Sequence, residues 1–489
     1  MPSFEQRTGL QTPESKRDEQ TRPAGPESQK RQEEHDAVTE KMQPRSKLPE
    51  AYVKEKNRRK EIQEILTQAG ELDEELKKHF LTTSETGSLE SSIDKIEAIE
   101  TLSSGEEVVE SRKNAAGQEN VSVTTKREYA GDPPRIAFAK PQSGEPLYGH
   151  DDETGKSYKI LRVFKNGKMF ERREYLKKTS DIEAENEEFA FREAKKYLPV
   201  YKRNIAEAYG IDSTEVPLDE EQFAAHFGIE DGKSTLREYV VSRLNEVMGM
   251  NVVPLTVLRK EQNGADYASV QEAVKGTDPE KAPRELKKED IQNIINKIRT
   301  GDTASPEVRS LVRIATLDRL IKSTDRHMGN FLMDPASGEI KGIDNGLSLG
   351  LSSKTQEGIK PLRPLRSFPL EIVNKFPDLK LDAEQLEHFK SFYGDTKEYL
   401  AFKENLGKGN ILEEKAREAE MQIKGEKFRY VSKLFRLLHG NEKIAQAEAK
   451  EFFKNIAYII DHGRPEISEG LLMDEHGEMI DTMKGQQAA

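Results

Sequence analysis

The stretch Ser323-Thr-Asp-Arg-His-Met-Gly-Asn-Phe-Leu-Met-Asp-Pro-Ala-Ser-Gly-Glu-Ile-Lys-Gly-Ile-Asp-Asn-Gly346 carries the most informative residues of this chain. Its middle, Asp334 to Gly338, consists of turn-forming residues and joins two short apolar runs at 331–333 and 341–343, which predicts a hairpin. A hairpin brings its outer ends together. We therefore expect Asn330, which enters it, and Asp344, which leaves it, to present their side-chain oxygens to one point.

Amide and carboxylate oxygens are groups that magnesium accepts as ligands, commonly one or two from the protein together with substrate phosphates. Asp325 precedes Asn330 in the same loop, where it can accept the proton of an attacking hydroxyl. Each residue alone has an ordinary interpretation, because Asp in a loop usually caps a turn and Asp-Asn-Gly is common turn chemistry. Together, in this order after an apolar helix, they favour phosphoryl transfer from ATP with magnesium.

The composition restricts the class of protein. The 489 residues include no cysteine, which excludes disulfides, thiolate zinc sites and cysteine nucleophiles. The net charge of −12 disfavours binding to nucleic acid. Residues 1–10 hold no apolar signal core, and no apolar run approaches the roughly 18 residues of a membrane-spanning helix. We expect a soluble, cytoplasmic protein with no transmembrane segment, although export without an apolar signal stays open.

The pattern along the chain indicates an α+β protein. Residues 1–118 are charged and poor in aromatics, which predicts a mostly disordered extension with one helix at 49–80, able to bind a protein partner and dispensable for folding of the rest. Residues 119–276 form a β-rich part with strands at 121–125, 135–140, 251–258 and 268–274, a helix at 236–248 and a helical insertion at about 156–230. Residues 277–462 form a helical part, which includes a helix that begins near Ser305 and Pro306. Residues 463–489 form a polar tail.

The quoted residues resemble a known family. Asp325-Arg-His-Met-Gly-Asn330 followed by Ile343-Asp-Asn-Gly346 is similar to the catalytic and metal loops of the phosphatidylinositol 3-/4-kinase superfamily. The Asp-Asn-Gly-Leu ending looks most like type II phosphatidylinositol 4-kinases, and the Asp-Arg-His opening looks more like 3-kinases and HipA-type bacterial protein kinases. Weaker resemblances, shared in part with uncharacterised bacterial relatives, extend to the segments at 138–149, 236–254, 268–276 and 316–321.

The resemblance implies an atypical, two-lobed protein-kinase-like fold, with a small β-rich lobe and a larger helical lobe, that uses ATP and magnesium. It implies a role for each matching residue. Lys140 would contact the nucleotide phosphates, Glu238 would pair with Lys140, and the backbone near Val274 and Lys275 would bind adenine. Asp325 would be the catalytic aspartate and His327 would stabilise the transferring phosphate. Asn330 and Asp344 would bind the metal.

Some features depart from the family pattern. No Gly-x-Gly-x-x-Gly loop precedes Lys140, and the insertion separates this lysine widely from Glu238. Lys165 is therefore a rival for the phosphate-contacting role. Glu238 has a second interpretation as well, because Thr235-Leu-Arg-Glu238 fits a helix capping box.

The acceptor stays open between a protein, a small-molecule hydroxyl and a phosphoinositide. The segment 347–369 occupies the activation-loop position of the family, and its cations could meet an anionic group or lie in solvent. Two other functions are compatible with the same residues: a pseudokinase-type scaffold that binds nucleotide without turnover, and transfer of a nucleotidyl group. The cations of this segment are Lys354, Lys360, Arg363 and Arg366.

Overall fold

The computed structural model divides the chain into two compact units, residues 1–58 and 59–489. In the first unit only the helical residues 48–58 are described, so the description below concerns the second. The structure describes residues 48–82, 89–104, 106–107, 112–113, 122–127, 135–141, 147–151, 156–165, 168–175, 198–218, 233–260, 266–274, 283–355, 358–361, 365–406 and 411–465.

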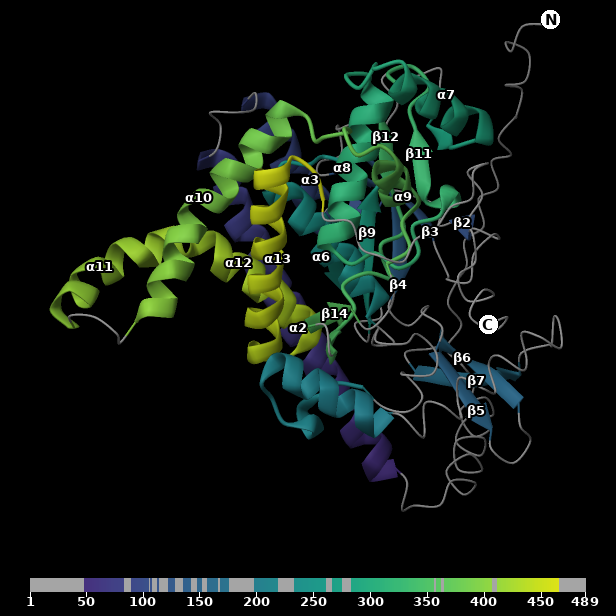
Figure 1. The fold of residues 1–489 in the computed structure, drawn as a ribbon. Coiled ribbons are helices and arrows are strands. Elements are labelled where there is room, and N and C mark those ends of the chain that lie inside the picture. The colour runs from purple at the N-terminus through teal and green to yellow at the C-terminus, as the bar shows by residue number, and fades with distance from the viewer. Residues whose placement is uncertain are drawn as a thin grey trace, which may run out of the picture. The chain divides into compact units, whose positions relative to one another are not determined.

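A six-stranded antiparallel sheet holds the β-rich part together, in the order β1-β3-β4-β9-β8 with β2 paired to β3 (Figure 1). Strand β4 lies between β3 and β9, and Lys140 is opposite Ser269 in this register. Ala137 and Ala139 are buried on one face of β4, and side chains alternate along a strand, so Lys140 points to the other face. The strands are β1 (Glu106–Glu107), β2 (Arg112–Lys113), β3 (Ser122–Arg127), β4 (Arg135–Pro141), β8 (Thr256–Lys260) and β9 (Tyr267–Glu272).

The strand expected at 251–258 begins later than predicted, at Thr256. Asn251 has a φ of 51°, a left-handed conformation that no regular strand contains. The side-chain oxygen of Asn245 accepts the backbone N–H of Val252 at 2.9 Å and of Val253 at 3.3 Å. These bonds replace the strand pairing that the apolar run at 252–255 suggested.

The helix predicted at 49–80 is present as α2 (Leu48–Thr82), and a second helix, α3 (Leu89–Ser104), lies in the part of the extension that was expected to be disordered. The sequence predicts a mostly disordered extension up to residue 118, whereas both helices contribute side chains to the main hydrophobic core. On α2 these recur every three, four or seven residues, the spacing of one helix face. The buried apolar residues are Ile62, Ala69, Leu72, Leu76 and Phe80 of α2 and Ala98, Ile99 and Leu102 of α3.

A buried polar cluster ties α2 to α6 (Ser234–Val247). Asp73 accepts hydrogen bonds from Arg243 Nε at 2.7 Å and from the Tyr239 hydroxyl at 2.8 Å. The Arg243 side chain is fully buried, and the guanidinium also lies over the Tyr239 ring. A buried charge is stable only when it is paired, so α2 is a structural partner of α6.

The rest of the chain is mainly helical, as predicted. Helix α8 is preceded by Ser305 and has Pro306 in its first turn, and its apolar residues are buried on most faces. Ser305 is the residue before the helix but its hydroxyl donates to Asp302 O at 3.2 Å instead of capping. The helices are α7 (Lys288–Arg299), α8 (Pro306–Leu320), α9 (Phe368–Lys375), α10 (Ala383–Asn405), α11 (Ile411–Lys424), α12 (Glu426–His439) and α13 (Glu442–His462).

The insertion expected to be helical at 156–230 is only partly so. Its first part forms an antiparallel sheet of β5 (Leu147–Asp151), β6 (Lys156–Lys165) and β7 (Lys168–Tyr175). Residues 158–164 are rich in aromatic and β-branched side chains, which are more common in strands than in helices. Residues 198–209 are helical, η2 (Ser213–Glu215) follows, and residues 176–197 and 219–232 lie outside the described residues.

Five short strands complete the fold, an α+β arrangement that is mostly helical with small antiparallel sheets. Strands β10 (Arg284–Glu285), β11 (Phe331–Met333) and β12 (Ile340–Gly342) form one sheet, and β13 (Ser352–Thr355) pairs with β14 (Gly358–Pro361). None of the helices in the described ranges is long and apolar enough to cross a membrane.

One carboxyl in this fold predicts a dependence of stability on pH. Glu371 in α9 is buried, and its Oε2 has no hydrogen-bond partner among the described residues. Burial raises the pKa of Glu371 from 4.5 to about 7, and Lys375 offsets only part of this effect. The folded state then holds the proton more tightly, so stability should fall as pH rises from 4.5 to about 7 and stay lower above it.

We expect Glu371→Gln to remove this fall, since glutamine keeps the shape of the protonated acid. The melting temperature of the variant should exceed that of the wild type at about pH 8 and match it at about pH 5. Glu384→Gln, an exposed carboxyl on α10, serves as the control. Equal pH profiles of wild type and Glu371→Gln in a thermal melt would contradict the assignment.

Candidate functional site

The predicted hairpin is confirmed, and it places Asn330 and Asp344 at the same end. Phe331 pairs with Gly342 and Met333 with Ile340. The turn closes through the N–H of Gly338, which donates to Asp334 O at 2.8 Å. Beyond the strands, the N–H of Ile343 donates to Asn330 O at 2.9 Å, which extends the pairing to the residue before Asp344.

The loop that enters the hairpin is held by local hydrogen bonds. Asn330 ends the short helix η3 (Met328–Asn330), and its Nδ2 donates to Asp325 O at 2.8 Å. This bond uses the amide nitrogen of Asn330 and leaves the Oδ1 oxygen for another partner. His327 Nδ1 accepts the N–H of Gly329 at 3.1 Å, so its proton sits on Nε2 when the ring is neutral. The side chains of Asp325 and His327 are both exposed.

Lys140 contacts two of the carboxylates that the sequence singled out. Its Nζ lies 3.1 Å from Glu238 Oε1 and 3.3 Å from Asp344 Oδ1. Glu238 comes from α6 and is 2% exposed, whereas the Asp344 side chain is 53% exposed. The pairing that the resemblance implies for Lys140 and Glu238 is therefore present, although 98 residues separate them. The three side chains come from a strand, a helix and the end of a hairpin.

The capping-box interpretation of Glu238 is wrong. Helix α6 begins at Ser234 after Lys233, and no side chain caps this end. The carboxylate of Glu238 instead accepts bonds from Lys140 and from Asn345, at 2.9 Å from the backbone N–H and 3.2 Å from Nδ2. Sequence reasoning missed Asn345, which looked like a turn residue beside Asp344. Its position directly after a candidate metal ligand was the one available signal.

The charge of Asp344 is set by its neighbours. Partial desolvation by the surrounding atoms disfavours its ionised form, but the Lys140 ammonium more than offsets this, and the pKa of Asp344 lies below its usual value of 3.8. The carboxylate is therefore ionised at neutral pH. Stabilisation from its ion pair is present above pH 3.8 and is lost as pH falls through the lowered pKa.

Asp344 adopts a left-handed backbone conformation, with φ at 58°. Such a conformation costs a residue with a side chain roughly 1–2 kcal/mol, so the surrounding contacts must hold it. The residues on either side of Asp344 supply this restraint. Ile343 is hydrogen-bonded to Asn330, and Asn345 is hydrogen-bonded to Glu238 and Arg326.

Arg326 is the second residue that sequence reasoning left without a role. It is 2% exposed, and its guanidinium donates to Asp318 of α8, to Ile343 O and to Asn345 Oδ1. Asp318 also accepts the hydroxyl of Ser367, which precedes α9, at 2.7 Å. Arg326 therefore connects the loop of Asp325 with the residues that flank Asp344.

Other predicted residues lie elsewhere or outside the described part of the chain. Lys165 ends β6, in the separate sheet of β5, β6 and β7, and the lysine that meets Glu238 and Asp344 is Lys140. Val274 follows β9, and Lys275 is outside the described residues. In the segment 347–369, Arg366 is exposed, Lys354 and Lys360 lie on β13 and β14, and Arg363 is outside the described residues.

The donors at the end of the hairpin fit magnesium in number and type. Over the described ranges, no group of three or more His, Asp and Glu side chains could hold a metal by itself. Asn330 offers one free amide oxygen and Asp344 one ionised carboxylate. Magnesium often takes only one or two protein ligands and completes its shell with water and substrate phosphates.

Comparison with known proteins gives similarity to solved structures alone. No protein-family model matches the chain, and no curated protein gives a significant match. Among solved structures, the chain is similar to the Helicobacter pylori proinflammatory kinase CtkA, with 10% sequence identity and a TM-score of 0.23 over 72% of this chain and 98% of that chain. A similarity at this TM-score supports no argument about activity, which has to come from the geometry of the chain itself.

Proposed function

We propose that this protein is an ATP- and magnesium-dependent kinase with a two-lobed, protein-kinase-like fold, which transfers the γ-phosphoryl group to a hydroxyl acceptor. The observation that carries the proposal is the position of Lys140, which contacts both the buried Glu238 and the ionised Asp344. A lysine held by a helix glutamate, next to a metal-binding aspartate, is the arrangement that kinases use at the nucleotide phosphates. The lobes would be residues 119–276 and 277–462.

The roles follow from the contacts. Lys140 would bind the phosphates, with Glu238 fixing its position and Asn345 fixing Glu238. Asn330 Oδ1 and the Asp344 carboxylate would hold magnesium, whose charge offsets that of the phosphates during transfer. Asp325 would accept the proton of the attacking hydroxyl, and the exposed His327 Nε2 would donate to the transferring group. Val274 and its neighbour Lys275 would present backbone groups to adenine.

The scaffold alternative is less well supported, because a protein that only binds nucleotide does not need an intact set of Asp325, Asn330 and Asp344. The contacts of Asn330 and Asp344 leave one oxygen ligand on each available for a metal. The acceptor classes to be assayed are protein, small-molecule and lipid hydroxyls.

A thermal-shift titration with ATP and magnesium tests the proposal first. Saturation at 100 times the dissociation constant adds about 2.7 kcal/mol of stability, so a magnesium-dependent rise in melting temperature is expected. Candidate acceptors are then incubated with the protein and ATP labelled on the γ-phosphate, and mass analysis of the acceptor should show an added phosphate group. No shift with magnesium and ATP would overturn the proposal, and a nucleotidyl mass on the product would replace it with nucleotidyl transfer.

A further inference from the structure

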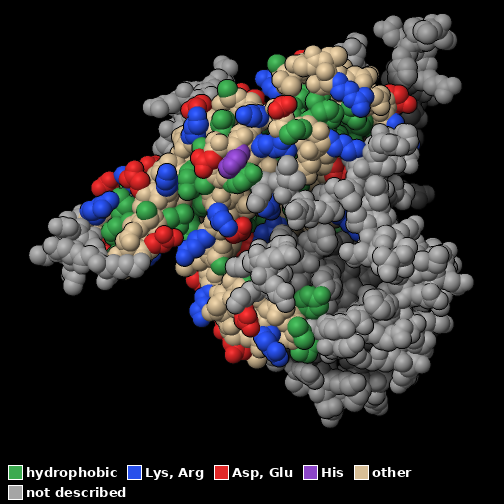
Figure 2. Space-filling model, viewed as in Figure 1, with side chains coloured by type: hydrophobic (Ala, Val, Ile, Leu, Met, Phe, Trp, Pro, Cys, Tyr) green, Lys and Arg blue, Asp and Glu red, His purple; other side chains and the backbone are tan. Residues whose placement is uncertain are grey.

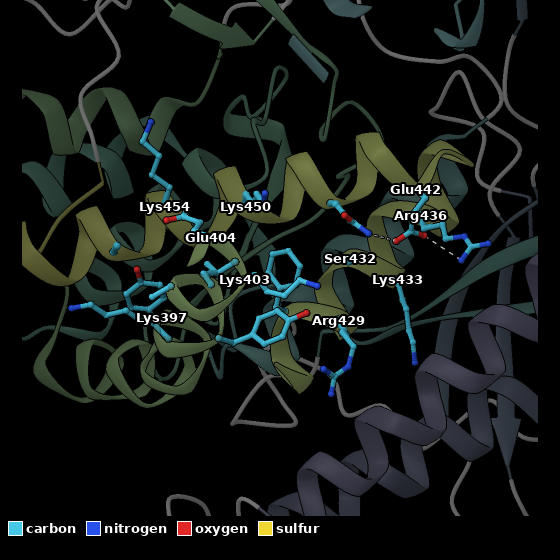
Figure 3. A pocket seen from close by; sticks show the side chains of 17 residues that line it. Lys397, Lys403, Glu404, Arg429, Ser432, Lys433, Arg436, Glu442, Lys450 and Lys454 are labelled. Carbon is cyan, nitrogen blue, oxygen red and sulfur yellow. Dashed lines mark hydrogen bonds and ion pairs between the residues drawn. The ribbon is translucent and has the colours of Figure 1, made fainter. Parts of the chain in front are cut away.

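A second concave site lies among α10, α12 and α13, which pack on one another (Figure 3). This pocket has a volume of about 810 Å³ and shares no residue with the proposed nucleotide site. Two arginines and five lysines line it, against the two carboxylates of Glu404 and Glu442. The lysines are Lys397, Lys403, Lys433, Lys450 and Lys454.

The excess of positive charge is local, because the whole chain has a net charge of −12. Lys and Arg side chains stand among Asp and Glu over α10 and α13 on the face that Figure 2 shows. At the pocket itself seven cations meet two carboxylates. In a mostly acidic protein, such a local concentration of cations attracts an anion to the pocket.

Neighbouring carboxylates neutralise only part of this charge. Arg436 pairs with Glu442 at 3.2 Å, and Lys433 pairs with Glu75 of α2. Lys454 reaches Glu451 only at 3.9 Å. Within the described ranges, no carboxylate forms an ion pair with the other three lysines of the pocket, Lys397, Lys403 and Lys450.

Two of the lysines repel each other in the present arrangement. Lys450 and Lys454 are one turn apart on α13, and both are exposed. Like charges at this spacing destabilise a helix unless a counter-charge lies between them. Figure 3 shows both on the same helix at the edge of the pocket.

The wall of the pocket contains an unused hydrogen-bond donor. Ser432 of α12 is 7% exposed, and its hydroxyl has no hydrogen-bond partner among the described residues. A buried hydroxyl without a partner destabilises the folded state, so a ligand oxygen that accepts its proton would be bound favourably. The rings of Tyr399 and Phe428, whose centroids lie 5.7 Å apart, also line the pocket and give it an apolar surface.

We propose that this pocket binds a small molecule that carries several phosphate groups. Lysine ammonium groups and a hydroxyl suit phosphate oxygens, and the excess of cations suits a ligand with more than one negative group. The volume falls in the range of about 300–1,000 Å³ that is typical of small-molecule sites. A soluble polyphosphate and the phosphorylated head group of a lipid share this chemistry. The proposal does not depend on the kinase assignment.

Isothermal titration of the full chain with inorganic tripolyphosphate tests this site. The titration is made in a Lys140→Ala background, which removes phosphate binding at the proposed nucleotide site. In that background, Lys450→Glu with Lys454→Glu should weaken binding at least about tenfold. The matched control, Lys288→Glu with Lys390→Glu, makes the same charge change at exposed lysines outside the pocket and should stay within about twofold.

Three results would overturn the proposal. The first is that neither tripolyphosphate nor phosphorylated lipid binds. The second is that the pocket pair and the control pair of substitutions weaken tripolyphosphate binding equally. The third is that Lys140→Ala alone abolishes all binding. The last result would assign the phosphate to the nucleotide site and would leave the kinase proposal intact.

Flotation with phosphatidylcholine vesicles, with and without a doubly phosphorylated phosphoinositide, distinguishes the two sources of ligand. Binding to the phosphoinositide vesicles that is lost in Lys450→Glu with Lys454→Glu identifies a head group as the ligand. Binding of tripolyphosphate without vesicle binding identifies a soluble ligand. Either result supports the site.

Discussion

Asp344→Asn is expected to lower magnesium-dependent ATP turnover by roughly 100- to 1,000-fold, the loss typical when one charge-stabilising group leaves an active site. The change removes the negative charge from the carboxylate that Lys140 keeps ionised, and a magnesium ion bound as proposed would keep only amide oxygens as protein ligands. The magnesium-dependent part of the thermal shift with ATP should disappear as well. Release of phosphate from ATP measures turnover even while the acceptor is unknown.

Glu339→Gln is the matched control for this variant. It makes the same change from carboxylate to amide at an exposed position of the same hairpin. Its turnover should stay close to that of the wild type, which would show that the hairpin tolerates the change in charge. Turnover of Asp344→Asn within about threefold of the wild type would refute the assignment of Asp344 as a metal ligand.

Asp73→Ala is expected to reduce the free energy of unfolding by about 3–5 kcal/mol, the usual cost when one partner of a buried ion pair is removed. Arg243 is fully buried, and its Nε donates to Asp73 Oδ1 at 2.7 Å. The Tyr239 hydroxyl keeps a bond to Ala69 O at 2.9 Å but loses the one to Asp73. Denaturation in urea, followed by circular dichroism, measures the change.

Two further variants separate the ion pair from the helix that carries it. Glu71→Ala removes an exposed carboxylate from the same turn of α2 and should change stability by less than about 0.5 kcal/mol. Asp73→Ala combined with Arg243→Met should recover much of the loss, because no charge then remains buried. A loss below about 1 kcal/mol in Asp73→Ala alone would mean that α2 does not support α6.

The same contacts predict the opposite of the sequence-based expectation that residues 1–118 are dispensable. A chain that begins after Ser104 would lose the core residues of α2 and α3 and leave Arg243 unpaired. We expect no cooperative unfolding transition in urea for that truncated chain. A sharp transition at wild-type denaturant concentration would restore the earlier interpretation.

The sequence by itself predicted what depends on neighbours along the chain. Turn chemistry at Asp334 to Gly338 predicted the hairpin, and the hairpin placed Asn330 and Asp344 at one end. Periodicity predicted the helix α6 and the strand β4 with boundaries within a few residues. These features are local, since turn propensity and side-chain spacing act over fewer than about ten residues.

Only the tertiary structure decided which partner each of several residues takes. Glu238 fits a capping box in sequence, but its carboxylate bonds to Lys140 and Asn345, which lie 98 and 107 residues away along the chain. The polar helix α2 belongs to the core because a few apolar residues and Asp73 meet α6 on one face. The basic pocket exists because α10, α12 and α13 bring their lysines together. Composition and periodicity describe one segment at a time, whereas burial and ion pairing depend on which segments meet in the folded chain.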